Sequence, residues 1–118
     1  MKTRRREITA YVTRDGSEIR ELMHPDVHGN RQQSLAEAII QPGQQTRLHR
    51  HRLSEELYHV THGTGIMTLA GETLAIGVGD TVLIRPGTAH SVTASGGEAL
   101  HLLCCCSPPY RHDDTELL

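Results

Sequence analysis

A cluster of imidazole and carboxylate side chains lies near the middle of the chain, in the stretch HRHRLSEELYHVTHG at residues 49–63. It contains four of the nine histidines and two adjacent glutamates. His49 and His51 are separated by one residue, so in an extended strand both imidazoles point to the same face. This spacing allows two nitrogen ligands to reach one metal ion.

Two further side chains are suited to complete a metal site with these histidines. Four residues separate His51 from Glu56, which is enough for a turn that brings back an adjacent strand with its carboxylate facing the same point. His90 follows the turn sequence RPGTA and opens another strand-like segment. We therefore predict a metal site made by His49, His51, Glu56 and His90. The alternative is that these are polar residues at the mouth of a barrel and hold no ion.

The elements that must position these residues are short. From residue 34 onward, apolar segments of about five residues alternate with glycine-containing turns, a pattern typical of an all-β sandwich or barrel. Ala70-Gly71, between IMTLA and ETLAI, predicts a tight hairpin. Further strands are expected within residues 8–22. The polar, proline-led tail, residues 107–118, is assigned no regular structure, and residues 1–118 are expected to form a single domain.

The spacing of these residues resembles the first of two sequence signatures of the cupin superfamily. That signature is a glycine, five residues, His-x-His, three or four residues, a glutamate, six residues and a glycine. The residues that match it are Gly43, His49, His51, Glu56 and Gly63. Glu55 satisfies the shorter spacing but misplaces the closing glycine, so Glu56 is the better match.

The second cupin signature is a glycine, five residues, Pro-x-Gly, two residues, a histidine, three residues and an asparagine. Gly79, Gly87 and His90 match it in register. The sequence departs from the signature at Arg85, where the proline is usual, and at Ala94, where the asparagine is usual. Because that asparagine is not a metal ligand in the family, the predicted ligand set remains intact.

The resemblance covers residues 34–106 and is strongest to small single-domain cupins, many of which carry a label borrowed from mannose-6-phosphate isomerases. It implies an antiparallel jelly-roll β-barrel that holds one divalent transition metal ion. A mixed nitrogen and oxygen ligand set suits Fe, Mn, Ni, Co, Cu or Zn and is a poor match for Mg or Ca. The resemblance also implies a homodimer, for which residues 8–22 are candidate contacts.

The function predicted from this resemblance is that of a metal-dependent enzyme acting on a small oxygen-rich molecule. Two reaction classes fit: dioxygenase-type chemistry on an enol or diol, and isomerase or epimerase chemistry on a sugar-like compound. The alternative is a non-catalytic cupin that binds or senses a small molecule.

Strand parity suggests which other side chains face the site. It places Arg47 on the face of His49, as a candidate for binding a substrate carboxylate or phosphate. It places Tyr58 on the face of Glu56, as a candidate proton donor, and His101 is the other candidate for acid–base catalysis. The alternatives are an ion pair at the rim for Arg47 and a core aromatic for Tyr58, while the parity of His101 stays open.

The composition excludes some other classes of protein. The net charge is −2 with neutral histidines, which argues against a nucleic-acid binder that relies on positive charge. No apolar stretch reaches membrane-spanning length and no signal-peptide core follows the basic start, so we expect a cytoplasmic protein. The three cysteines are consecutive, Cys104–Cys106, and neighbours in a strand face opposite ways. We interpret them as small apolar strand residues in a reducing compartment.

Overall fold

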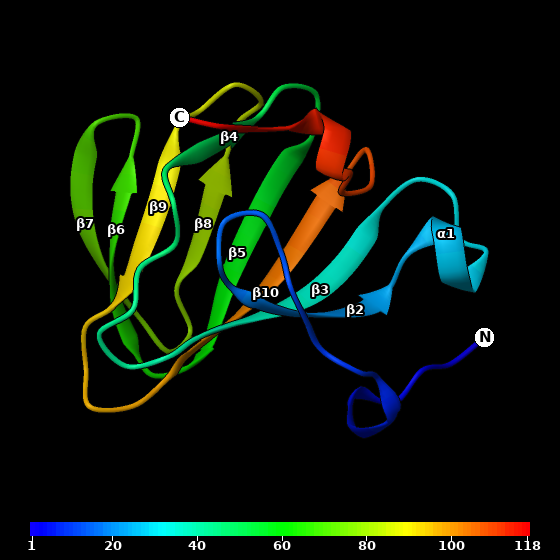
Figure 1. Cartoon of the computed structure of the whole chain (residues 1–118), viewed down its shortest axis with the longest axis horizontal. Helices are drawn as coiled ribbons and strands as arrows, with labels where there is room; N and C mark the ends of the chain where they lie inside the picture. Colours follow the sequence, from blue (N-terminus) through cyan, green and yellow to red (C-terminus); the bar gives the residue numbers. More distant parts are fainter.

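Two antiparallel β-sheets face each other in the computed structural model, which describes residues 1–118 (Figure 1). The six-stranded sheet runs in the order β1 (Tyr11–Val12), β2 (Glu18–Met23), β3 (Ser34–Ile40), β10 (Leu100–Ser107), β5 (Glu55–His62) and β8 (Thr81–Ile84). The five-stranded sheet runs in the order β11 (Thr115–Leu117), β4 (His49–His51), β9 (His90–Ala94), β6 (Thr64–Leu69) and β7 (Glu72–Gly77). The predicted all-β class is confirmed.

Alternation of side chains along the strands builds the interior between the two sheets. In β10, Leu100, Leu102, Cys104 and Cys106 are buried, while the residues between them are partly exposed on the outer face. The core is assembled from Ile, Val, Leu, Ala and Met together with Cys104, and Tyr58 is its one buried tyrosine. All three cysteines are free, as expected from their positions on alternating faces.

The predicted hairpin and the predicted N-terminal strands are both present. Ala70 and Gly71 have φ values of 51° and 82°, and two positive φ values are what a two-residue turn of type I′ requires between β6 and β7. Strands β1 and β2 pair with each other, and β2 pairs with β3. The N-terminal hairpin is thereby part of the six-stranded sheet.

The C-terminal tail is structured, contrary to our prediction. After β10 the chain forms a short 3-10 helix, His112–Asp114, and then strand β11, which pairs with β4 (Figure 1). This strand carries no apolar alternation that would reveal it in the sequence. It is held by its backbone ladder to β4 and by the Arg50–Glu116 ion pair, at 3.1 Å.

The remaining helical segments are single turns. One is a 3-10 helix at Arg5–Glu7 and the other is α1 (Pro25–His28), which is capped by the His24 side chain and ends at Gly29 in the left-handed region. A helix with the length and apolar character needed to cross a membrane is not found in the structure.

Gly63 occupies a position between β5 and β6 that tolerates no side chain. Its φ is +79°, and a Cβ there would overlap the carbonyl oxygen of Ala99 and lie 3.2 Å from the Cα of Leu100. We expect Gly63→Ala to lower the free energy of unfolding by about 2–4 kcal/mol, combining backbone strain with overpacking. Urea denaturation would measure this. Gly97→Ala is the control, because a Cβ at that position would meet nothing within 4 Å; equal losses in both variants would contradict the explanation.

Candidate metal centre

Strands from both sheets bring the four predicted ligands together. β4 buries His49 and His51 on one face and leaves Arg50 between them partly exposed, as the His-x-His spacing predicts. His90 opens β9 and pairs directly with His49 across the ladder. Glu56 comes from β5 in the opposite sheet. The four side chains therefore meet in the interior between the sheets.

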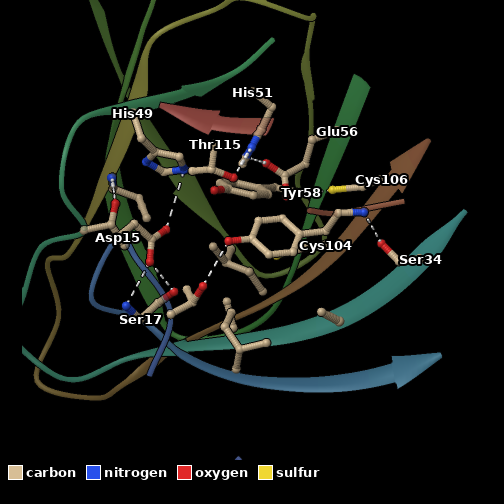
Figure 2. A pocket seen from close by; sticks show the side chains of 18 of the residues that line it. Asp15, Ser17, Ser34, His49, His51, Glu56, Tyr58, Cys104, Cys106 and Thr115 are labelled. Atoms are coloured by element: carbon tan, nitrogen blue, oxygen red, sulfur yellow. Dashed lines mark hydrogen bonds and ion pairs between the residues drawn. The ribbon is translucent and has the colours of Figure 1, made fainter. Parts of the chain in front are cut away.

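The ligating atoms converge on one point. The ring nitrogens of His49, His51 and His90 lie within 4.8 Å of one another. Glu56 Oε1 lies 3.2 Å from His51 Nε2 and 3.5 Å from His90 Nε2. Figure 2 shows His49, His51 and Glu56 reaching into the same cavity.

Backbone carbonyls fix the orientation of two of the imidazoles. His49 Nδ1 lies 2.7 Å from the carbonyl oxygen of Arg47, and His90 Nδ1 lies 2.9 Å from that of Thr88. A carbonyl oxygen only accepts hydrogen bonds, so each Nδ1 carries the proton and donates it. The Nε2 atoms of both rings are then left with free lone pairs directed at the cluster.

Thr115 of the C-terminal tail fixes the third imidazole. The Thr115 hydroxyl donates to the carbonyl oxygen of Arg111 at 3.0 Å, so its oxygen is available to accept from His51 Nδ1, at 3.1 Å. His51 therefore has the same tautomer as the other two histidines, with Nε2 free. This contact lies in the tail for which we had predicted no structure.

The electrostatics of the cluster keep Glu56 ionised. Burial raises the pKa of Glu56, but the adjacent His51 and His90 imidazoles oppose this more strongly and lower the pKa to about 2. Burial lowers the pKa of His51, and Glu56 outweighs it so that the pKa is raised. Burial and then repulsion from His90 lower the pKa of His49, which favours its neutral form.

This arrangement fits a transition metal ion. Glu56 Oε1 and His90 Nε2 are buried and have no hydrogen-bond partner, although buried polar atoms are nearly always paired. Two ligand atoms that are each about 2.1 Å from an ion lie at most ~4.2 Å apart. The ring nitrogens here lie within 4.8 Å of one another, so small shifts would let them bind one ion. An ion at this point would satisfy both unpaired atoms.

Beside the ligands lies a cavity with a volume of about 40 Å³, which is room for roughly three water molecules. Tyr58 lines it, as parity predicted, and its ring centre lies 5.9 Å from that of His90. Burial, followed by the charge of Glu56, raises the pKa of Tyr58, so the residue is a neutral phenol. Tyr58 can therefore donate a hydrogen bond or a proton at this site.

The structure does not bring Arg47 and His101 to the cavity. Arg47 is exposed and absent from the cavity wall, because β4 begins at His49 and its parity does not extend back to residue 47. His101 lies on the outer face of β10, with its ring 4.9 Å from that of His62. The expectation from parity that Arg47 faces the site is therefore wrong, and His101, whose parity was open, faces outward and cannot act in the cavity.

Sequence reasoning missed several side chains that hold the ligands. Cys106 Sγ donates to Glu56 Oε2 at 3.3 Å, and burial raises the pKa of this thiol, so it keeps its proton. The Asp114 carboxylate accepts from the backbone N–H groups of Leu53 and Ser54, at 2.9 and 3.1 Å. Asp114 thereby fixes the loop between the strands that carry His51 and Glu56. No short motif in the sequence signals either contact.

Removal of any one ligand is expected to empty the site. In protein purified without an affinity tag or chelator, His51→Ala, His90→Ala and Glu56→Gln should each reduce bound metal from about one equivalent to near zero while the barrel stays folded. Elemental analysis and thermal denaturation would measure this. His59→Ala is the matched control, since His59 lies outside the cluster and contacts Thr81. A full equivalent of metal in all three variants would refute the ligand assignment.

The contact between Thr115 and His51 is expected to tune metal affinity. Thr115→Val keeps the shape of the side chain but removes the acceptor for His51 Nδ1, and the loss of such a supporting contact weakens metal binding by about 10- to 100-fold. Thr115→Ser keeps the hydroxyl and should bind metal as the wild type does. Competition with a chromophoric chelator would measure the affinities; equal values for the valine and serine variants would show that the hydroxyl has no such role.

Known proteins resemble this chain in sequence and in fold. Residues 36–106 match the cupin domain family. The uncharacterised protein MJ1618 of Methanocaldococcus jannaschii is 48% identical over 118 residues, which span 100% of this chain and 94% of that protein. Among solved structures, a predicted oxalate decarboxylase from Thermotoga maritima has a TM-score of 0.80 at 25% identity, over 91% of this chain and 98% of that one.

Two further structures share the fold at lower identity. The polyketide cyclase RemF from Streptomyces resistomycificus has a TM-score of 0.81 at 22% identity, over 92% of this chain and 79% of that one. The nucleoside dehydratase Pac13 from Streptomyces has a TM-score of 0.82 at 15% identity, over 100% of this chain and 90% of that one. The family match, residues 36–106, begins in β3, ends in β10 and covers more than half of the chain. The chain therefore belongs to the cupin domain family.

Proposed function

We propose that this cupin is a metal-dependent enzyme that acts on a small oxygen-rich molecule in the cavity beside His49, His51, Glu56 and His90. The observation that carries the proposal is the convergence of three Nε2 atoms and one carboxylate oxygen, with every Nδ1 engaged elsewhere. The expected ion is Fe, Mn, Ni, Co, Cu or Zn. When bound, it would supply a Lewis acid that polarises a substrate oxygen.

The number of ligands supports catalysis rather than a purely structural role for a metal held by these four residues. Four protein ligands leave about two positions of a six-coordinate ion free, whereas structural metal sites are usually closed by protein atoms. The free positions would face the cavity that Tyr58 lines. A substrate with two neighbouring oxygen atoms is the simplest occupant of two such positions.

Tyr58 is the residue we propose for proton transfer or hydrogen bonding to the substrate. It is buried and neutral, and it faces the same interior as the ligand set. As a proton donor to a substrate oxygen it suits isomerase or epimerase chemistry, in which an enolate or enediol oxygen is stabilised while a carbon is deprotonated and reprotonated. The same phenol also suits dioxygenase-type chemistry, in which it would orient an enol or diol without exchanging a proton.

The second candidate function is a non-catalytic cupin that binds or senses a small molecule. One observation favours it: the imidazoles at the cavity all belong to the proposed ligand set, and His101 points outward. The cavity therefore has no spare imidazole to act as a general base. The two candidates differ in whether a bound molecule is recovered unchanged.

A turnover experiment tests the proposed function. Protein loaded with each metal in turn would be incubated with α-hydroxycarbonyl compounds and vicinal diols, with and without O₂, and the products followed by NMR. We expect metal-dependent conversion that is lost in His90→Ala and falls by about 10²- to 10⁴-fold in Tyr58→Phe with metal retained. Binding with unchanged recovery would favour the sensing role. Absence of bound metal after reconstitution would refute the metal-dependent enzyme and favour a binding role that needs no metal.

A further inference from the structure

Chain segments outside the family match contribute part of the cavity wall, and the charged side chains of the wall other than the histidines are all acidic. The N-terminal hairpin contributes two carboxylates, Asp15 and Glu21, to the residues that line the cavity. No lysine or arginine is among those residues. Apart from the histidines, the ionisable groups in the lining are acids, phenols and thiols. A bound anion would therefore find no cationic side chain there.

Asp15 is the carboxylate next to the ligand set. The residue is 9% exposed and sits in the turn between β1 and β2. Its Oδ1 accepts from the backbone N–H of Ser17 at 2.9 Å and from the Ser17 hydroxyl at 2.6 Å. Its Oδ2 lies 3.6 Å from His49 Nε2, which is beyond hydrogen-bond length (Figure 2). Oδ2 therefore faces His49 Nε2, the atom that would bind the metal, but receives no hydrogen bond from that atom.

Backbone hydrogen bonds hold Asp15 at this place. Within the turn, Thr13 N–H donates to the carbonyl of Ser17 and Gly16 N–H donates to that of Thr13, both at 3.0 Å. The N–H of Arg47, two residues before His49, donates to the carbonyl of Asp15 at 2.8 Å. The turn is thus tied to the segment that leads into β4, and the carboxylate is positioned before any ligand arrives.

The turn itself does not need the second oxygen of Asp15. Oδ1 alone makes both contacts with Ser17, which leaves Oδ2, 3.6 Å from His49 Nε2, without a contact in the turn. Glu21 offers a further acceptor: its Oε1 accepts from the Tyr11 hydroxyl at 2.8 Å, and its Oε2 is buried without a partner. A donor that enters the cavity would satisfy the buried, unpaired Glu21 Oε2 and could also reach Asp15 Oδ2.

We infer that Asp15 is a ligand-binding residue that accepts a hydrogen bond from a hydroxyl or N–H group of the molecule bound at the metal, and that the site selects neutral or cationic hydroxylated molecules over phosphates and carboxylates. This inference rests on the proposed function, because it places the molecule at the metal. If the inference is correct, this protein does not act on oxalate. Oxalate is a dianion and is the substrate in the name of the similar predicted oxalate decarboxylase from Thermotoga maritima.

Glycolate and glycolamide provide a matched pair of probes. They have the same shape and the same hydroxyl, but the first is an anion and the second is neutral with an added N–H donor. Each would be titrated into Co(II)-loaded protein, with the visible absorption of the Co(II) ion as the readout. No turnover is required. Asp15→Asn removes the charge and keeps the shape, Asp15→Ala removes the acceptor as a second variant, and Asp26→Asn is the control for charge at an exposed position.

The expected result is a change in selectivity with metal binding intact. Asp15→Asn and Asp15→Ala should bind Co(II) as the wild type does, while the ratio of glycolate affinity to glycolamide affinity rises by about tenfold or more, because a negative charge beside the site is gone. Asp26→Asn should leave the ratio unchanged. Thermal denaturation would confirm that each variant is folded.

Three other results would overturn the inference. An unchanged ratio in the folded Asp15 variants would show that Asp15 does not face the bound molecule. A fall in Co(II) affinity of about tenfold or more, with an altered spectrum, would make Asp15 a metal ligand instead. A wild-type protein that binds no Co(II) would refute the proposed function, and the inference with it. The Co(II) titration therefore separates failure of the proposed function from failure of the role of Asp15.

Discussion

The burial of one carboxylate and three imidazoles between apolar sheets is the constraint on which the rest of this structure depends. An ionised carboxylate in such an interior is unfavourable unless opposite charge or hydrogen-bond donors surround it. Cys106 donates to one oxygen of Glu56, whereas the other oxygen, which the His51 and His90 rings approach, has no hydrogen-bond partner. The imidazoles in turn need fixed acceptors for their Nδ1 protons, and those acceptors all lie outside the two strands that carry the rings.

The segments that flank the family match complete the site. Asp114 and Thr115 in the C-terminal tail hold the loop after β4 and the ring of His51, and Asp15 in the N-terminal hairpin faces His49. The shared cupin core thus provides the ligands, while the flanks determine what else surrounds the ion. Because one fold hosts many functions, differences in selectivity among cupins are expected to arise in such flanks.

The parts of the site that depend on local periodicity could be predicted from the sequence, and the others could not. One-residue spacing put His49 and His51 on one face, and the same parity put Tyr58 with Glu56. Parity failed for Arg47 because β4 is only three residues long, and β11 was missed because its pairing with β4, not an apolar pattern, makes it a strand. Asp15 was missed because its position depends on a contact between distant segments.

The two unpaired atoms of the cluster indicate what the interior is arranged for. A buried polar atom without a partner lowers stability by about 1–3 kcal/mol, and Glu56 Oε1 and His90 Nε2 are two such atoms at one point. No neighbouring group pairs with these two atoms. Cys106 donates to the other oxygen of Glu56, Oε2, and the Thr88 carbonyl accepts from the other nitrogen of His90, Nδ1. A cysteine thiol is well suited to that place, because burial beside Glu56 keeps it protonated and it can only donate to the carboxylate. The thiol thereby directs Oε1 toward the histidines, and a bound ion is the partner that would satisfy both unpaired atoms at once.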